Sequence, residues 1–130
     1  DLCPFERHTA AVSWNAFVSE HIDKSKHLEL MPDQELTSST IVSFRIKNQA
    51  GQYLSHAELR NFYTHLCSQT HEGFSKYHKV LIGQPVKYGE RSFVRLAIGA
   101  RSVRQFIEEG SCFNDDRRLL DIIETLARNY

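Results

Sequence analysis

Apolar residues recur at helical spacing in the first part of the chain, over residues 9–25. Side chains three and four positions apart share one face of a helix, so this spacing predicts an amphipathic helix. Its buried face would consist of Trp14, Phe17, Val18, His21 and Ile22. The next segment, KHLELMPDQ, contains Pro32 and is interpreted as a break between elements. Residues 39–46, STIVSFRI, are β-branched and aromatic, which predicts a strand.

Residues 55–67 carry the most complete helix pattern of the chain. Ser55 and Glu58 have the spacing of a capping box, in which each side chain binds the backbone amide of the other residue. Apolar residues then repeat at i, i+3, i+4 and i+7. They are Leu59, Phe62, Tyr63 and Leu66. We expect a helix that begins at this box and buries that face.

Two further strands are predicted, over 78–88 and 91–99, with a short polar turn around Gly89 between them. This arrangement favours an antiparallel hairpin. Pro85 lacks the amide that a ladder of hydrogen bonds needs, which indicates an edge position or a bulge.

The last helix is expected over about 114–128, with Asn114 as its N-cap. Its buried stripe would consist of Leu119, Ile122, Ile123 and Leu126. The order α-β-α-β-β-α predicts an α+β fold, with a three- to four-stranded, mostly antiparallel sheet and helices packed on one face. We expect a single domain over 1–130, in which 1–30 form a connecting helix and linker and 31–130 form the α+β unit.

Arg95 interrupts an otherwise apolar stretch, SFVRLAIG, in the last predicted strand. Because side chains alternate along a strand, Arg95 shares a face with Phe93 and Ala97, opposite to Val94 and Leu96. Such an arginine commonly extends into water over its apolar neighbours. The alternative is recognition of a carboxylate, because the guanidinium is a rigid fork that matches two carboxylate oxygens. The residues alone leave both interpretations open.

Composition narrows the classes of partner. Sixteen basic and sixteen acidic residues give a formal net charge of zero, which argues against a nucleic-acid or anionic-membrane partner. No apolar run reaches the length of a membrane span. Three widely spaced cysteines form neither a disulfide framework nor a metal motif, which favours a cytoplasmic setting. No nucleophile, phosphate-loop or dinucleotide motif occurs, and the abrupt start, DLCPFERH, indicates a piece of a longer chain.

Three segments in this order resemble the C-terminal small domain of fold-type I pyridoxal-phosphate enzymes, most nearly that of the group II amino-acid decarboxylases. They are STIVSFRIKN, LSHAELRNFYTHLC and KVLIGQPVKYGERSFVRLAIGARSV. The family has a Phe-Arg strand, here Phe44 and Arg45, then a helix, a hairpin and a last strand similar to residues 93–98, although one residue before its arginine is missing here. The segment at 9–25 resembles the helix that precedes this domain.

The resemblance implies roles that the residues alone do not show. It implies that Arg95 helps to hold the carboxylate of an amino-acid substrate, and that pyridoxal phosphate is bound mainly by a large domain outside this chain. The chain would be part of a lyase or transferase, catalytically incomplete by itself. Its partners would be its own large domain or a second subunit of a homodimer. Residues 104–118 depart from the family, in which the last helix follows the strand directly.

A second class of function stays open. A stand-alone α+β module that binds a small molecule or regulates a partner fits the balanced charge and the missing catalytic set. Within the enzyme class, an aminotransferase or desulfurase small domain shares the same plan as the decarboxylase domain. A large domain encoded upstream would favour the enzyme.

Overall fold

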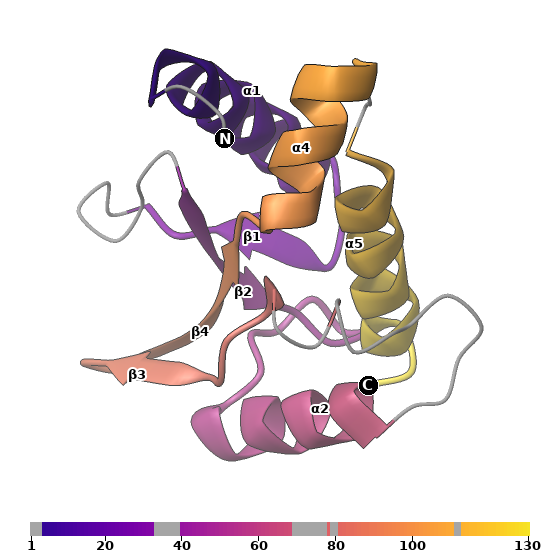
Figure 1. Ribbon diagram of the computed structural model, residues 1–130. Coiled ribbons are helices and arrows are strands. Elements are labelled where there is room, and N and C mark those ends of the chain that lie inside the picture. Colours follow the sequence, from indigo (N-terminus) through magenta and orange to yellow (C-terminus); the bar gives the residue numbers. More distant parts are fainter. Residues whose placement is uncertain (1–3, 33–39, 69–77, 79–80, 111–112) are drawn as a thin grey trace.

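Backbone pairing joins four strands into an antiparallel sheet in the order β1-β2-β4-β3, seen at the left of Figure 1. The computed structural model describes residues 4–32, 40–68, 78, 81–110 and 113–130. The strands are β1 (Leu28–Leu30), β2 (Ile41–Ile46), β3 (Val86–Tyr88) and β4 (Arg91–Ala97). The helices are α1 (Pro4–Asp23), α2 (His56–Ser68), α4 (Ala100–Glu109) and α5 (Asn114–Ala127). Within these residues the predicted α+β class, with helices packed on one face of an antiparallel sheet, is confirmed.

The register of the sheet decides which side chains meet the helices. Val42 of β2 lies opposite Leu96 of β4, and Phe44 lies opposite Val94. Directly opposed residues point to the same face of a sheet, and all four of these are buried. We call their side of the sheet the inner face. The helices complete the core with Trp14, Val18, Ile22, Leu59, Phe62, Leu66, Leu119, Leu120 and Ile123.

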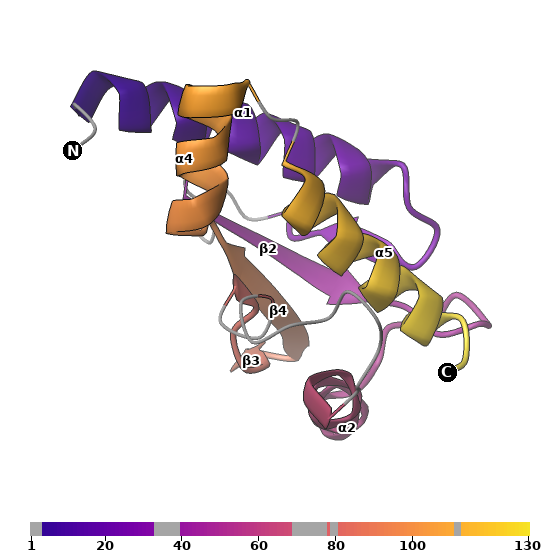
Figure 2. The same cartoon turned by 45° about the vertical axis from the view of Figure 1, so that its right-hand side comes forward.

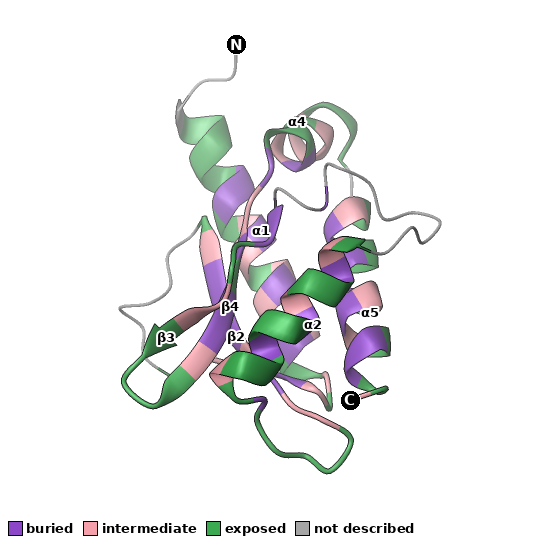
Figure 3. Cartoon of the chain, turned by 90° about the horizontal axis from the view of Figure 1, so that it is seen from below, coloured by how far each residue is buried: buried purple, intermediate pink, exposed green. Residues whose placement is uncertain are grey.

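The helices surround the inner face from several directions. α1 crosses above the sheet, α5 runs beside it and α2 lies below it (Figures 1 and 2). α4 packs against α1, and its Phe106 contacts the same core. Buried residues therefore line the facing sides of α1, α2 and α5, while their outer sides are exposed (Figure 3). α1 begins at Pro4, earlier than the predicted start at residue 9.

α2 begins as its capping box predicts. The backbone amide of Ser55 donates to Glu58 Oε1 at 2.9 Å, and the amide of Glu58 donates to Ser55 Oγ at 3.2 Å. These bonds hold the pKa of the Glu58 carboxyl below its usual value. Leu59, Phe62 and Leu66 are buried, which confirms the predicted inner side of this helix.

The sequence predicts a break where the structure has β1, and this prediction is wrong. Leu28–Leu30 is too short to show alternation, and it becomes a strand because β2 offers a pairing edge. Leu28 lies opposite Ile46 and Leu30 opposite Phe44. The sheet therefore begins inside the segment that was expected to be a linker.

The predicted hairpin is confirmed, but its first strand is shorter than expected. Only Val86–Tyr88 pairs continuously with β4, whereas a strand is predicted over 78–88. Residues 79–80 of that prediction lie outside the described part of the chain. Pro85 immediately precedes β3 and cannot donate to the ladder, which limits the length of the strand. β3 lies at the edge of the sheet, as Pro85 indicates.

The chain before β3 still reaches β4 through two backbone contacts. Ile82 forms a single bridge with Leu96, and the amide of Gly83 donates to the carbonyl of Arg95 at 2.9 Å. On its other side, Arg95 lies opposite Ser43 of β2, whose carbonyl accepts from the amide of Met31. β4 thus lies between β2 and the segment that precedes β3.

The C-terminal part contains two described helices where the sequence predicts one. Residues 104–118 hold the end of α4 and the start of α5, rather than a plain connection. α4 ends at Gly110, whose φ of 64° suits a residue without a side chain. Asn114 is not the cap of α5, so that prediction is wrong. Phe113 occupies the cap position with a φ of 55°, and its buried ring stacks on Phe106 with centroids 5.0 Å apart. Packing, not a polar cap, sets this helix start.

Candidate functional site

The face of the sheet opposite the inner face carries a group of charged residues. Alternate side chains of a strand point to opposite faces, so the residues between the core positions point outward. Glu29 of β1 lies opposite Arg45 of β2, and Ser43 lies opposite Arg95 of β4. We call this side of the sheet the outer face. Both arginines named in the sequence comparison with the decarboxylases lie on it.

Arg95 is an exposed side chain on a central strand of this face. Among the described residues, its guanidinium makes no hydrogen bond or ion pair. Its neighbours Phe93 and Ser43 are 2% and 0% exposed. Arg95 is therefore an exposed side chain among buried neighbours, and it lies on the face that strand alternation predicts. This geometry leaves the guanidinium available to an outside anion.

Arg45 is held more tightly than Arg95. Its guanidinium carbon lies 4.2 Å from the centroid of the Tyr53 ring, which is the geometry of a cation–π contact. The Nε atom of Arg45 is enclosed and has no hydrogen-bond partner in the described structure. The side chain as a whole is half-buried. Arg45 is thus a fixed cation with unused donor capacity.

A turn at Asn48 brings Tyr53 onto the outer face. The Asn48 side-chain oxygen accepts from the amides of Ala50 and Gln52, at 2.9 and 3.0 Å. Gly51 has a φ of 79°, which a residue without a side chain adopts easily. The chain then returns beside β2, where Tyr53 bridges to Lys47.

Glu29 is the carboxylate of this group, and its partners are Tyr53 and Lys47. The Tyr53 hydroxyl donates to Glu29 Oε2 in a short hydrogen bond, and Lys47 Nζ lies 3.2 Å from Oε1. The Tyr53 bond, with the nearby charges of Lys47 and Arg45, holds the pKa of Glu29 below its usual value. No ion pair joins Glu29 to Arg45 within the described structure. Among the described residues of this face, three cations, Arg45, Lys47 and Arg95, therefore accompany one carboxylate.

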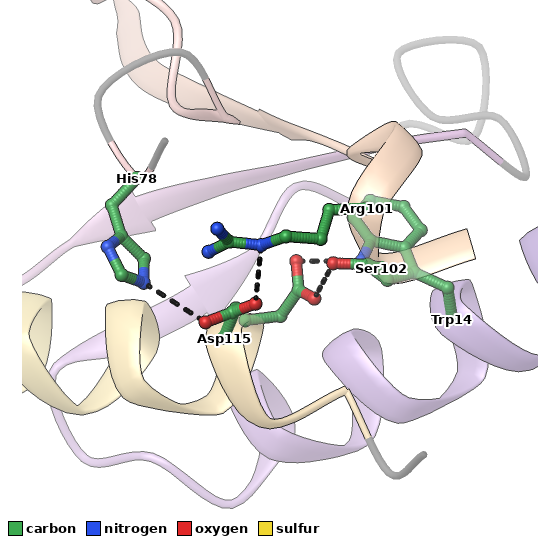
Figure 4. Close-up of polar contacts among 6 residues, drawn as sticks. Trp14, His78, Arg101, Ser102 and Asp115 are labelled. Carbon is green, nitrogen blue, oxygen red and sulfur yellow. Dashed lines mark hydrogen bonds and ion pairs between the residues drawn. The ribbon is translucent and has the colours of Figure 1, made fainter. Parts of the chain in front are cut away.

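A second polar cluster joins three helices beneath the surface (Figure 4). The indole Nε1–H of Trp14 donates to Asp116 Oδ1 at 3.1 Å, and Ser102 Oγ donates to Asp116 Oδ2 at 2.8 Å. Asp116 is 0% exposed, and burial raises the pKa of its carboxyl although both hydrogen bonds act in the other direction. The cluster connects α1, α4 and α5.

His78 lies at the rim of this cluster. Its Nε2 is 3.9 Å from Asp115 Oδ1, while Arg101 Nε lies 3.1 Å from Asp115 Oδ2 (Figure 4). His78 is 3% exposed, and burial lowers the pKa of its imidazole despite the nearby Asp115. Because a ligand cannot reach His78 or Asp116, we interpret these groups as structural. Another candidate from the sequence, His71, lies outside the described residues.

A pocket of about 410 Å³ lies between the start of α2 and the hairpin. His56 Nδ1 lies 2.8 Å from Ser92 Oγ there, and Lys87 and Glu90 add opposite charges. The helix amides nearby are already used by the capping box of α2. The pocket therefore favours neither sign of charge in a ligand.

The described residues limit other classes of site. They contain no group of three histidine, cysteine or acidic side chains that could hold a metal ion. None of the helices in that part of the chain is both long and apolar enough to span a bilayer. No protein-family model, curated protein or solved structure matches this chain.

Sequence reasoning identified Arg95 but gave no role to Arg45 or Tyr53. Alternation around Arg45 could have placed it on the same face as Arg95, because both strands bury the residues on either side of their arginine. Which residues lie opposite each other depends on the register of β2 and β4, and that is a tertiary property. Nothing in the local sequence indicates that Tyr53 covers Arg45.

Proposed function

We propose that this chain is the C-terminal small domain of a pyridoxal-phosphate-dependent enzyme that acts on an amino acid, in the manner of a decarboxylase. In this proposal Arg95 binds the carboxylate of the substrate. The observation that carries it is the exposed guanidinium of Arg95, which has no ion pair among the described residues although it lies on a central strand. The family resemblance of the surrounding strand supplies the reaction class.

The position of Arg95 suits this role physically. A guanidinium offers two parallel donors to the two oxygens of a carboxylate. The Arg95 carbonyl accepts from the amide of Gly83, and Arg95 lies opposite Ser43 within the ladder of β2 and β4, so the base of the side chain is fixed. A fixed base reduces the entropy that is lost when the substrate is oriented.

The described residues of this chain do not fit the cofactor itself. A lysine that forms an imine needs a lowered pKa, which burial commonly provides. The lysines in the described ranges are exposed or half-buried, and Lys47 and Lys24 are paired with carboxylates. We therefore place the cofactor on a large domain outside this chain and assign this chain no step of the cofactor chemistry.

The partners follow from the same proposal. The outer face, with Arg95, would meet the large domain of the same polypeptide or a second subunit of a homodimer. The substrate would lie in the seam between them. We place the enzyme in the cytoplasm, because three separated cysteines suit a reducing compartment.

Replacement of Arg95 in the natural full-length protein tests this function. Arg95→Gln should lower kcat/KM for the amino-acid substrate by the equivalent of about 2–4 kcal/mol, the scale of a lost charge-assisted pair. Cofactor content, measured by absorption, should stay unchanged. Arg91→Gln is the matched control, because Arg91 is an exposed arginine at the hairpin end of the same strand. It should leave kcat/KM within twofold.

Two results would overturn the proposal. One is a full-length protein that binds no pyridoxal phosphate. The other is an Arg95→Gln enzyme with the same kinetics as the Arg91→Gln control.

The second candidate is a stand-alone small-molecule-binding or regulatory module. The observation that favours it is a core closed by the chain's own helices, in which Trp14, Phe44 and Leu119 are all 0% exposed. A start codon beside Asp1 and a stable, monodisperse protein that binds an effector would support this candidate over the enzyme.

A further inference from the structure

Ser92 and His56 meet at the wall of the pocket between α2 and the hairpin. Ser92 Oγ lies 2.8 Å from His56 Nδ1, and both side chains are half-buried and line the pocket. A serine hydroxyl can act as a nucleophile when a base stands within hydrogen-bond reach, at roughly 2.6–3.2 Å. The two residues are 36 positions apart in sequence, so a local motif cannot reveal their contact.

The fold directs both side chains to this place. Ser92 alternates with Val94 and Leu96 along β4, so its side chain points to the inner face at the hairpin end of the strand. α2 lies below the hairpin (Figure 1), and His56 is its first residue, directly after the capping-box serine that fixes the start of the helix. His56 is therefore held at a defined position against Ser92.

The proton of the Ser92 hydroxyl is directed at a base. Neither Ser92 nor His56 makes a second side-chain hydrogen bond within the part of the chain that the structure describes. In the tautomer that carries its proton on Nε2, the imidazole accepts a hydrogen bond at Nδ1. Ser68 differs, because its Oγ donates to the carbonyl of His65, which cannot take up a proton as a base does.

Lys87 adds a positive charge beside this contact. It lies opposite Ser92 in the register of β3 and β4 and lines the same pocket. Directly opposed residues point to one face, with Cβ atoms about 4.5–5.5 Å apart. The Lys87 ammonium can therefore reach the oxygen of a carbonyl group that reacts at Ser92, where negative charge develops. Glu90 balances the charge of the pocket as a whole, which favours an uncharged reactant.

We propose that Ser92 is a nucleophile that takes up the acyl group of an uncharged carboxylic ester, with His56 as its general base. Ser92 Oγ bonds to the carbonyl carbon of the ester, and its proton passes to His56 Nδ1. The bond from that carbon to the alkoxy oxygen breaks, and the alcohol leaves with the proton from His56. The acyl group stays on Ser92 Oγ, so the step needs no redox partner. It uses neither Arg95 nor pyridoxal phosphate and is independent of the proposed function.

Reaction of the full-length protein with p-nitrophenyl acetate tests this proposal. The probe is an uncharged ester, and peptide mass spectrometry locates and times the transfer of its acetyl group. We expect acetylation at Ser92 to be at least tenfold faster than at Ser68, which is exposed on the same chain. Ser55 should also react slowly, because it lines the same pocket but its hydroxyl is placed against the amide of Glu58.

His56→Gln removes the base and keeps a polar side chain. It should lower the rate of acetylation at Ser92 by about 100-fold, the lower end of what general-base catalysis contributes. His65→Gln is the matched control, because His65 is an exposed histidine of the same helix and does not line the pocket. It should leave the rate within twofold. Lys87→Gln should cause a smaller loss than His56→Gln, because the ammonium is exposed to water.

The wild-type protein alone can overturn the proposal, so it stays testable if circular dichroism shows that a variant does not fold. Acetylation at Ser92 no faster than at Ser68 would overturn it. An equal rate in wild type and in a folded His56→Gln variant would also overturn it and would make the contact between Ser92 and His56 a structural one. A protein that is acetylated at Ser92 but binds no pyridoxal phosphate would refute the proposed function alone.

Discussion

Asp116 has a carboxyl group enclosed among α1, α4 and α5, where Trp14 and Ser102 both donate to it. Burial raises the pKa of this carboxyl above its ordinary value. Folding therefore favours the protonated form. The stabilisation from this preference is complete below the ordinary carboxyl pKa, about 3.9, and is lost as the pH rises through the folded-state pKa.

Asp116→Asn should remove this pH dependence. The amide keeps an acceptor for Trp14 and offers a donor to the hydroxyl of Ser102, but it carries no charge. We expect the stability of Asp116→Asn relative to wild type to increase as the pH rises above about 4, measured by urea denaturation. His78 titrates in both proteins, and its lowered pKa makes stability fall with decreasing pH, so its contribution cancels in the difference.

Asp116→Ala is the comparison variant. It leaves the buried indole N–H without its acceptor and should be less stable than Asp116→Asn by about 1–3 kcal/mol. Equal stability of the two variants across the pH range would show that the carboxyl group has no polar role in this junction.

The elements differ in how far local sequence determines them. α2 was predictable, because its capping box and apolar repeat lie within one stretch of chain and the structure confirms both. β1 was not predictable, because three residues become a strand only through pairing with β2. The start of α5 was predicted at a polar cap, but the stacking of Phe113 on Phe106 sets it instead. Tertiary contacts, rather than local sequence pattern, therefore determine β1 and the start of α5.

The features of the candidate site also differ in how far the local sequence determines them. The face of Arg95 follows from alternation within one strand, which is a local property. The diagonal relation of Arg45 to Arg95 needs the register of two strands that are about fifty residues apart in sequence. The cover that Tyr53 gives to Arg45 needs, in addition, the conformation of the turn at Asn48.

Ser55→Ala tests the capping box of α2. Loss of the Ser55 hydroxyl leaves the amide of Glu58 without its side-chain acceptor. The free energy of unfolding should fall by about 1 kcal/mol, measured by chemical denaturation. Ser68→Ala, at the other end of the same helix, is the control and should change stability by less than about 0.5 kcal/mol. A Ser55→Ala variant as stable as the Ser68→Ala control would show that the capping box does not stabilise this helix.

At the scale of the whole molecule, α1 belongs to the same core as the sheet. Trp14, Val18 and Ile22 are each 0% exposed and pack with residues of the inner face. Trp14 also donates to Asp116 of α5 across most of the chain length. The segment that was expected to be a connecting helix and linker therefore packs into this core, and we expect the described elements to unfold as one unit.

Trp14→Ala should destabilise the whole chain. Removal of a fully buried aromatic side chain costs about 3–5 kcal/mol, a large part of the stability of a domain of this size. Thermal unfolding followed by circular dichroism and by tyrosine fluorescence should show one common transition at a lower temperature. Phe5→Ala is the control, because Phe5 is an aromatic residue of the same helix that is 77% exposed. Separate transitions for α1 and the sheet would contradict a single unit.

The main-chain bonds at Arg95 have a consequence for how such a domain evolves. The Arg95 carbonyl accepts from the amide of Gly83, and the neighbouring residues of β4 hold the strand against β2 through main-chain groups, which every non-proline residue possesses. The exposed side chain contributes nothing to the core, so its exchange leaves the scaffold intact. Ligand preference at position 95 can therefore change over generations by single substitutions, while selection for a stable fold acts on other residues.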